Sequence, residues 1–177
     1  NPVGNASFVY VPYCTGDLHY GTHVQHYELL GQSRDLRHVG ALNMTAFLKR
    51  LVPTFPQVER VILAGASAGG YGALLHAWRV QEAFGPNVRV DVLDDSGLPV
   101  PMEWQRFGTA MQAWQPEWPP GCTDCATVNY PALMPYNARA LPKSRQAVLA
   151  YRKDNVISTY FGITGDDVAS GLDAAKS

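Results

Sequence analysis

The stretch of sequence that decides the fold is VERVILAGASAGGYGALL, residues 58–75. Its first half is a short run of β-branched and aliphatic residues with the composition of a buried strand. Its second half places small residues first and larger apolar residues afterwards, as a helix does when it begins against a close neighbour. Residues 65–69, Gly-Ala-Ser-Ala-Gly, join the two halves. The stretch therefore predicts a strand over 58–64, a sharp turn at Ser67 and a helix over 69–84.

The same alternation of strand and helix continues on both sides of this turn. Apolar, β-rich runs predict further strands over 6–13, 88–93 and 146–151. Apolar residues near helical spacing predict further helices over 40–52, 104–114 and 156–161. Weak periodicity predicts loops over 18–37 and, apart from the helix over 104–114, over 98–140. Strands that alternate with helices predict an α/β protein with a mainly parallel sheet covered on both faces.

The length of the chain favours one domain. Its 177 residues can bury a sizeable core, and the sequence has no internal repeat and no long linker. We expect residues 1–177 to form a single α/β domain or the central segment of one. Within it, residues 98–145 are rich in Pro, Trp, Gln and Met, and we expect a loop-rich insertion or lid there.

Charge and hydropathy exclude several classes of function. The net charge is -1 and the basic residues are scattered, so the sequence shows no footprint for nucleic acid and no polybasic face for a membrane. The apolar runs are strand-sized, whereas a membrane-spanning helix needs about 20 apolar residues. We therefore predict no nucleic-acid partner and no membrane span.

The cysteines are one indication of the cellular compartment in which the protein works. Cys122 and Cys125 form a single Cys-x-x-Cys pair, and Cys14 stands alone. A structural zinc site would require a second pair of ligands, so the cysteines are either buried thiols or disulfides of an exported protein. Low charge and many Pro and Gly residues favour export, and we expect a secreted or periplasmic protein. Residues 1–5 lack the basic start and apolar core of a signal peptide, although a leader could already have been removed.

The turn at Ser67 has the pattern and the setting of a nucleophile elbow. Gly-x-Ser-x-Gly is a weak signal alone, but here it lies between a predicted buried strand and a predicted helix, as the mechanism requires. The start of that helix offers unpaired N–H groups, so the N–H of Ala68 can stabilise an oxyanion. The alternative is a glycine-rich turn that only packs tightly or binds an anion, and the sequence lacks the lysine and glycine spacing of the phosphate-binding loops.

A serine nucleophile needs a carboxylate and a histidine, which follow it in that order in α/β-hydrolases. Carboxylates stand at two later strand ends, Asp94 with Asp95 and then Asp154. The acid follows the second strand after the serine in most proteins of this fold, so Asp154 is favoured. Asp94 and Asp95 also fit a strand-end turn in which the side chain accepts backbone N–H groups. Asp166 and Asp167 follow no predicted strand and are expected to be solvated.

None of the histidines fits the order serine, aspartate, histidine. They are His19, His23, His26, His38 and His76. Four precede Ser67, and His76 lies in the predicted helix, facing away from the strand ends. We therefore expect the catalytic histidine outside these residues. A zinc site at His19, His23 and His26 beside Asp17 is the alternative role, but nothing completes a tetrahedral set, so we predict no metal and no cofactor.

Four segments together resemble the pectin acetylesterase family, which also contains the Notum-type carboxylesterases. They are Pro12–Gly21, Gly65–Ala73, Asp95–Gly97 and Tyr151–Ile157. The resemblance runs from about Phe8 to Phe161 and implies an α/β-hydrolase fold, metal-free ester hydrolysis, and Ser67 and Asp154 as two members of a triad. The family's Gly-Gly-Gly-Trp-Cys-like oxyanion segment and its terminal histidine do not occur here. The family's cysteines usually pair, which implies a partner upstream for Cys14.

The turn at Ser67 predicts a serine esterase. The resemblance implies that it removes a short acyl group, such as acetyl, from a carbohydrate or related ester, with a small molecule or a polysaccharide as the substrate. One alternative is a Notum-like lipid carboxylesterase, and another is a non-catalytic α/β binding domain. Without the missing histidine, this segment alone is expected to hydrolyse little. Trp104, Trp114 and Trp118 could form a sugar platform, but packing is at least as common a role for tryptophans so spaced.

Overall fold

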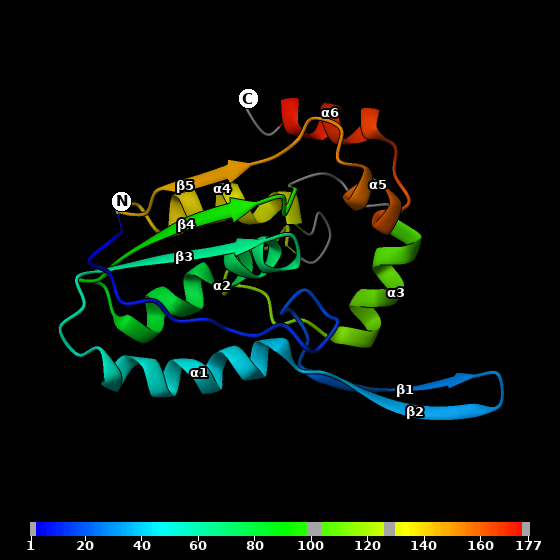
Figure 1. The fold of residues 1–177 in the computed structure, drawn as a ribbon, viewed down its shortest axis with the longest axis horizontal. Coiled ribbons are helices and arrows are strands. Elements are labelled where there is room, and N and C mark those ends of the chain that lie inside the picture. Colours follow the sequence, from blue (N-terminus) through cyan, green and yellow to red (C-terminus); the bar gives the residue numbers. More distant parts are fainter. Residues whose placement is uncertain (1–2, 99–103, 126–129, 175–177) are drawn as a thin grey trace.

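The computed structural model describes residues 3–98, 104–125 and 130–174, and it confirms the α/β fold. Its central sheet is parallel, with β3 (Arg60–Ala66), β4 (Arg89–Asp95) and β5 (Gln146–Leu149) in the order β3-β4-β5. The strands end in register, since Ala66 lies opposite Asp95, and Asp95 opposite Leu149. All three carboxyl ends therefore meet at one edge of the sheet (Figure 1).

Helices α1 (Gly40–Thr54), α2 (Ala68–Phe84) and α4 (Leu133–Ala140) pack behind one face of this sheet (Figure 1). Met44 and Leu48 of α1 join Val80 of α2 and Val90 of β4 in one buried cluster. Helix α4 is held to α2 by the Asn137 amide, whose Nδ2 donates to the Leu74 carbonyl at 2.9 Å. Burial of apolar side chains between these helices and the sheet forms the core.

The opposite face of the sheet remains open within the described part of the chain. Successive side chains of a strand point to opposite faces. Ile62 and Leu149 lie on the open face and are 43% and 55% exposed. The sequence predicts a sheet covered on both faces, and within the described residues helices pack on one of them.

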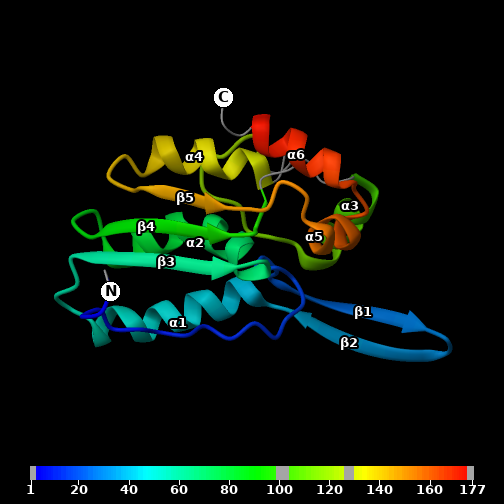
Figure 2. The ribbon, with the colours of Figure 1, turned by 45° about the horizontal axis from the view of Figure 1, so that its top comes forward.

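The remaining elements gather near the carboxyl edge of the sheet. Helices α3 (Trp104–Trp114) and α5 (Asn155–Phe161) lie beyond the strand ends (Figure 1), and α6 (Gly165–Ala174) follows α5. A short 3₁₀ turn, η1 (Tyr130–Ala132), precedes α4. Strands β1 (His23–Leu29) and β2 (Gln32–His38) form an antiparallel hairpin that projects away from the body (Figure 2).

The strand predicted over 6–13 is wrong. These residues have no strand pairing, and Phe8 and Tyr10 are 88% and 75% exposed. Their β-branched and aromatic composition suits a strand, but strand preference depends on packing against a neighbour. No described strand pairs with this segment, so the preference alone does not form one.

The loop predicted over 18–37 is also wrong, because β1 and β2 occupy most of it. Most side chains of both strands are exposed, so polar residues occur on both faces and the alternation that marks a half-buried strand is absent. The sequence also missed α4 and α6. Helix α4 contains Pro135 and buries the polar Asn137, whereas α6 buries only the small surface of Val168 and Gly171.

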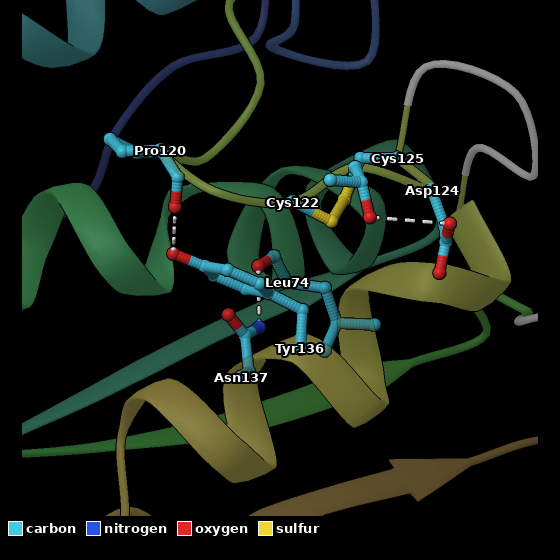
Figure 3. Close-up of a disulfide and its surroundings, with 8 residues drawn as sticks. Leu74, Pro120, Cys122, Asp124, Cys125, Tyr136 and Asn137 are labelled. Carbon is cyan, nitrogen blue, oxygen red and sulfur yellow. Dashed lines mark hydrogen bonds between the residues drawn. A yellow bond between two sulfur atoms is a disulfide. The ribbon is translucent and has the colours of Figure 1, made fainter.

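Within the segment 98–145, the described residues contain one disulfide and two packed tryptophans. Cys122 is bonded to Cys125, and nearby the Tyr136 hydroxyl donates to the Pro120 carbonyl at 2.9 Å (Figure 3). Trp114 is buried, and Trp118 packs edge-on against Tyr20 at 5.7 Å. Both rings therefore pack against the protein rather than forming a platform.

Three further predictions concern Trp104, the pairing of Cys14 and the absence of a membrane-spanning helix. The side chain of Trp104 lies outside the described residues. Cys14 is exposed and forms no disulfide with a described cysteine. Among the described helices, none combines the length and apolar character needed to cross a membrane.

Candidate active site

Ser67 occupies a strained turn between β3 and α2. Its backbone has φ 52° and ψ −116°, and the residue is exposed. A positive φ is unfavourable for a residue with a Cβ and persists only where the surroundings enforce it. Here the Ser67 N–H donates to the Asp95 carbonyl at 2.7 Å, and the Ser67 carbonyl accepts from the Gly70 N–H at 2.9 Å. The turn therefore presents the Ser67 hydroxyl at the edge of the sheet, as a nucleophile elbow does.

Three of the four glycines around the elbow are required by close contacts. A Cβ at Gly65 would overlap the backbone of Gly69, and one at Gly70 would overlap Oδ1 of Asp94. A Cβ at Gly72 would lie 2.9 Å from Cδ2 of His19. At Gly69, in contrast, an added Cβ would meet no atom within 4 Å. Of the two glycines of the Gly-x-Ser-x-Gly turn, Gly65 is therefore in close contact, while Gly69 faces open space.

This contrast makes a pair of neighbouring substitutions informative. We expect Gly70→Ala to lower the free energy of unfolding by about 1–3 kcal/mol, because the buried Asp94 carboxylate cannot move without losing its hydrogen bond to the Gly97 N–H. Gly69→Ala should leave it unchanged or raise it by about 0.5 kcal/mol, since alanine suits a helix better. Urea unfolding of both variants provides the measurement, and equal destabilisation would contradict the packing described.

Ala68 is the first residue of α2 and directly follows Ser67. The first N–H groups of a helix have no acceptor within it, and the positive end of the helix dipole favours negative charge beside them. The Ala68 N–H is therefore suited to stabilise an oxyanion formed by attack of Ser67, and its role in catalysis stays a prediction.

Asp94 and Asp95 point to opposite sides of β4. Asp94 is buried toward α2, where its Oδ1 accepts from the Gly97 N–H at 2.7 Å. Asp95 is exposed and accepts from the Ser96 hydroxyl at 2.9 Å. Asp94 thus makes the strand-end turn that the sequence offered as its alternative role.

Asp154 lies in the loop after β5 and caps helix α5. Its Oδ1 accepts from the N–H groups of Val156 and Ile157, both at 2.9 Å. The residue is half-buried, and its Oδ2 forms no hydrogen bond with the described residues. One carboxylate oxygen is therefore fixed by the helix, and the other is available to a histidine.

Two exposed ion pairs join the loop before Asp154 to α6. Arg152 binds Asp173 through two hydrogen bonds of 2.7 Å, and Lys153 lies 3.0 Å from Asp166. Exposed pairs of this kind contribute little to stability. They are contacts between the loop and α6 that water screens, and no role in the site is assigned to them.

Tyr71 connects the elbow to the helix that Asp154 caps. Its ring packs against Phe161 of α5 at 5.6 Å, and its hydroxyl donates to the Leu98 carbonyl at 3.3 Å. Burial raises the pKa of Tyr71, and the nearby carboxylates of Asp94 and, more weakly, Asp154 raise it further. Tyr71 is the residue four positions after Ser67, so the first turn of α2 packs directly on α5. No sequence pattern points to this contact of Tyr71, because Phe161 is distant from it along the chain.

Four of the histidines form hydrogen bonds that explain them structurally. Nδ1 of His76 accepts from Arg79, and its Nε2 donates to the His19 carbonyl at 2.7 Å, while burial lowers the pKa of His76 to about 3. The ring partners of the other three are the Thr15 carbonyl and Tyr27 hydroxyl for His38, the Ala113 carbonyl for His23, and Asp35 for His26. Among the described residues, no hydrogen bond joins a histidine to Ser67 or Asp154.

The metal alternative finds no support in the described part of the chain. No group of three His, Cys, Asp or Glu residues is placed there to hold a metal ion. Asp17, which the sequence analysis considered only as a metal ligand, has another role. Its buried carboxylate accepts from the N–H groups of Gly21 at 3.0 Å and Gly40 at 2.8 Å, joining the loop before β1 to the start of α1.

Comparisons with known proteins give the family of the chain. Residues 1–115 match the family model described as Pectinacetylesterase, a range that includes Ser67 but not Asp154. The sequence is 34% identical over 99 residues to the palmitoleoyl-protein carboxylesterase Notum2 of Xenopus laevis, and 33% identical over 98 residues to the human NOTUM carboxylesterase. Each alignment covers 52% of this chain and 19% of the relative.

A solved structure supports the same fold. The Wnt deacylase Notum from Drosophila superposes with a TM-score of 0.68 at 21% sequence identity, over 93% of this chain. This chain spans 55% of that structure. By its sequence and its fold, the chain belongs to the pectinacetylesterase family of carboxylic ester hydrolases, with the α/β-hydrolase architecture.

Proposed function

We propose that the protein is a serine esterase that removes a short acyl group, such as acetyl, from a carbohydrate or related ester. Ser67 is the nucleophile, the Ala68 N–H stabilises the oxyanion, and Asp154 orients a histidine supplied from outside the 177 residues. The observation that carries the proposal is the backbone of Ser67, whose φ of 52° is stabilised at the end of a parallel strand and the start of a helix. Membership of an ester hydrolase family supports the class of reaction.

The proposed reaction is a two-step acyl transfer. The histidine removes the proton of Ser67 as its oxygen attacks the ester carbonyl, and the Ala68 N–H binds the oxyanion. The intermediate collapses to an acyl-serine, and the histidine returns the proton to the departing alcohol. Water activated by the same histidine then hydrolyses the acyl-serine, releasing the carboxylic acid and restoring Ser67.

Covalent labelling tests this proposal directly. Full-length protein treated with a fluorophosphonate should form an adduct at Ser67, identified by peptide mass spectrometry, because an activated serine displaces fluoride from phosphorus. Ser96 provides an internal control, since it also follows a parallel strand with a positive φ of 63°. Labelling of Ser96 instead, or no labelling of either serine, would refute the assignment, and the second result would favour a non-catalytic binding domain.

A long-chain carboxylesterase is the second candidate, favoured by the names of the curated relatives. Aryl esters of increasing acyl length separate the two activities. A short-acyl esterase should show kcat/KM falling from acetyl to longer chains, whereas a Notum-like enzyme should show it rising. A lipid-type preference would therefore appear as a maximum at long chains.

We also propose that the protein is exported, to the periplasm or outside the cell. The disulfide between Cys122 and Cys125 supports this location, because structural disulfides persist mainly in oxidising compartments.

A further inference from the structure

The loop before the β1–β2 hairpin contains two consecutive strained residues. Leu18 and His19 have φ values of 54° and 64°, and neither is glycine. Such backbone strain is unfavourable and persists only where the surroundings enforce it, often at functional sites. The mechanism proposed above uses neither residue.

Three hydrogen bonds hold this backbone, two within its own loop and one from α2. The Leu18 N–H donates to the Tyr13 hydroxyl at 2.9 Å, and the His19 N–H donates to Oδ1 of Asp17 at 3.0 Å. The His19 carbonyl accepts from the buried His76 of α2 at 2.7 Å. The position of His19 is thus fixed relative to α2, the helix that begins at the elbow.

The ring of His19 lies against α2 at Gly72. A Cβ on Gly72 would meet Cδ2 and Cβ of His19 at 2.9 and 3.0 Å, so this approach is possible only beside glycine. On another side, the ring of Tyr13 lies 4.7 Å from that of His19. His19 is therefore held at its backbone by hydrogen bonds and at its ring by packing.

The two ring nitrogens distinguish His19 from the other histidines. Neither ring nitrogen of His19 forms a hydrogen bond with the described residues, whereas each of the other four histidines has at least one such bond. The ring is only half-buried. Burial lowers the pKa of His19, which keeps the imidazole neutral near pH 7, with one donor and one acceptor nitrogen.

The ring packs about one helical turn from the start of α2, which directly follows Ser67. Gly72 follows Ala68 by four residues, so the two positions share a face of α2, separated by about 6 Å along the helix. Gly69, on the turn between them, faces open space. We infer that His19 contacts the substrate and donates or accepts a hydrogen bond at a polar group on the alcohol side of the ester, such as a sugar hydroxyl. The inference rests on the proposed function.

The position of the ring favours the alcohol side over the reacting carbonyl. The oxyanion must lie within hydrogen-bond distance of the Ala68 N–H, and His19 packs one helical turn further along. An acetyl or aliphatic acyl group has no polar atom beyond its carbonyl. A sugar on the leaving alcohol, in contrast, carries hydroxyl groups several ångströms from the ester carbon.

Binding to a protein that cannot turn the ester over tests this contact. In full-length protein carrying Ser67→Ala, calorimetry measures the affinity for a partially acetylated oligogalacturonide, with and without His19→Ala. We expect His19→Ala to weaken binding about 5–10-fold, as expected for one lost hydrogen bond, and His19→Gln to recover part of the loss. The ring nitrogens of His19 should also shift in ¹⁵N spectra when the oligosaccharide is added, which a purely structural role does not predict.

A matched control and a sugar-free ester complete the experiment. His26→Ala, on the exposed hairpin, should bind the oligosaccharide as tightly as the parent. In the protein that retains Ser67, His19→Ala should leave kcat/KM on 4-nitrophenyl acetate within about two-fold. A comparable loss on this ester would show that His19 acts on the carbonyl or on the fold, and would overturn the inference.

Failure of this inference can be distinguished from failure of the proposed function. Unchanged affinity after His19→Ala, unchanged ring signals, or no binding of the oligosaccharide would each overturn the role of His19. A Ser67→Ala protein that still hydrolyses esters would instead refute the nucleophile. The binding and spectroscopic measurements on His19 would remain decisive in that case, because they do not require Ser67 to react.

Discussion

Replacing Ser67 with alanine in the full-length protein is expected to lower kcat on 4-nitrophenyl acetate by about 10⁴- to 10⁶-fold, with a small change in KM. The loss is large because the variant cannot form an acyl-enzyme, and the oxyanion donors alone provide only residual catalysis. Stability should change little, since the Ser67 side chain is exposed and the cap of α2 has no side-chain hydrogen bond from it. Steady-state kinetics together with urea unfolding provide the measurement.

Ser96 offers a close control for this substitution. It follows β4 as Ser67 follows β3, and both residues have a positive φ. Ser96 donates its hydroxyl hydrogen to Asp95 and is not followed by a helix in residues 97–98, so it lacks the helix N–H group that Ala68 places directly after Ser67. We expect Ser96→Ala to retain activity within a few-fold. A loss as large as that of Ser67→Ala would remove the distinction between the two strand ends.

The elbow could be predicted from sequence because its signals are local. The strand over 58–64 and the helix over 69–84 correspond to β3 and α2 with ends displaced by at most two residues. The hydrophobic pattern, the small residues and the Gly-x-Ser-x-Gly turn all favour the same structure there. A local structure can be predicted from sequence where such separate signals agree. The helix over 104–114 was predicted with the bounds of α3 for the same reason.

Other parts depend on contacts that sequence patterns do not contain. Residues 6–13 have strand composition, but whether they form a strand depends on a neighbouring strand. The environment of His19 depends on His76, which lies 57 positions away, and on Asp17, whose side chain also bonds Gly40. The different surroundings of Gly69 and Gly70 likewise arise from the buried side chain of Asp94. These contacts exist only once the helices lie on the sheet.

Replacing Asp154 with asparagine is expected to lower kcat by about 10⁴-fold in the full-length protein, because the amide cannot hold the catalytic histidine in the correct tautomer or stabilise its positive charge. The substitution suits this position. Asparagine caps a helix as well as aspartate does, so its amide oxygen can keep the bonds to the Val156 and Ile157 N–H groups. The melting temperature should therefore change little while activity is lost.

Asp95→Asn is the matched control for the acid. Asp95 ends the first strand after the nucleophile and is exposed, and its side chain accepts a hydrogen bond from the neighbouring Ser96 hydroxyl. We expect this variant to retain activity within about three-fold, because the charge it loses is screened by water. Kinetics of both variants at one pH, with unfolding curves to establish that each is folded, separate the two carboxylates. A severe loss for Asp95→Asn with an active Asp154→Asn would move the acid to β4 and leave Asp154 as the cap of α5.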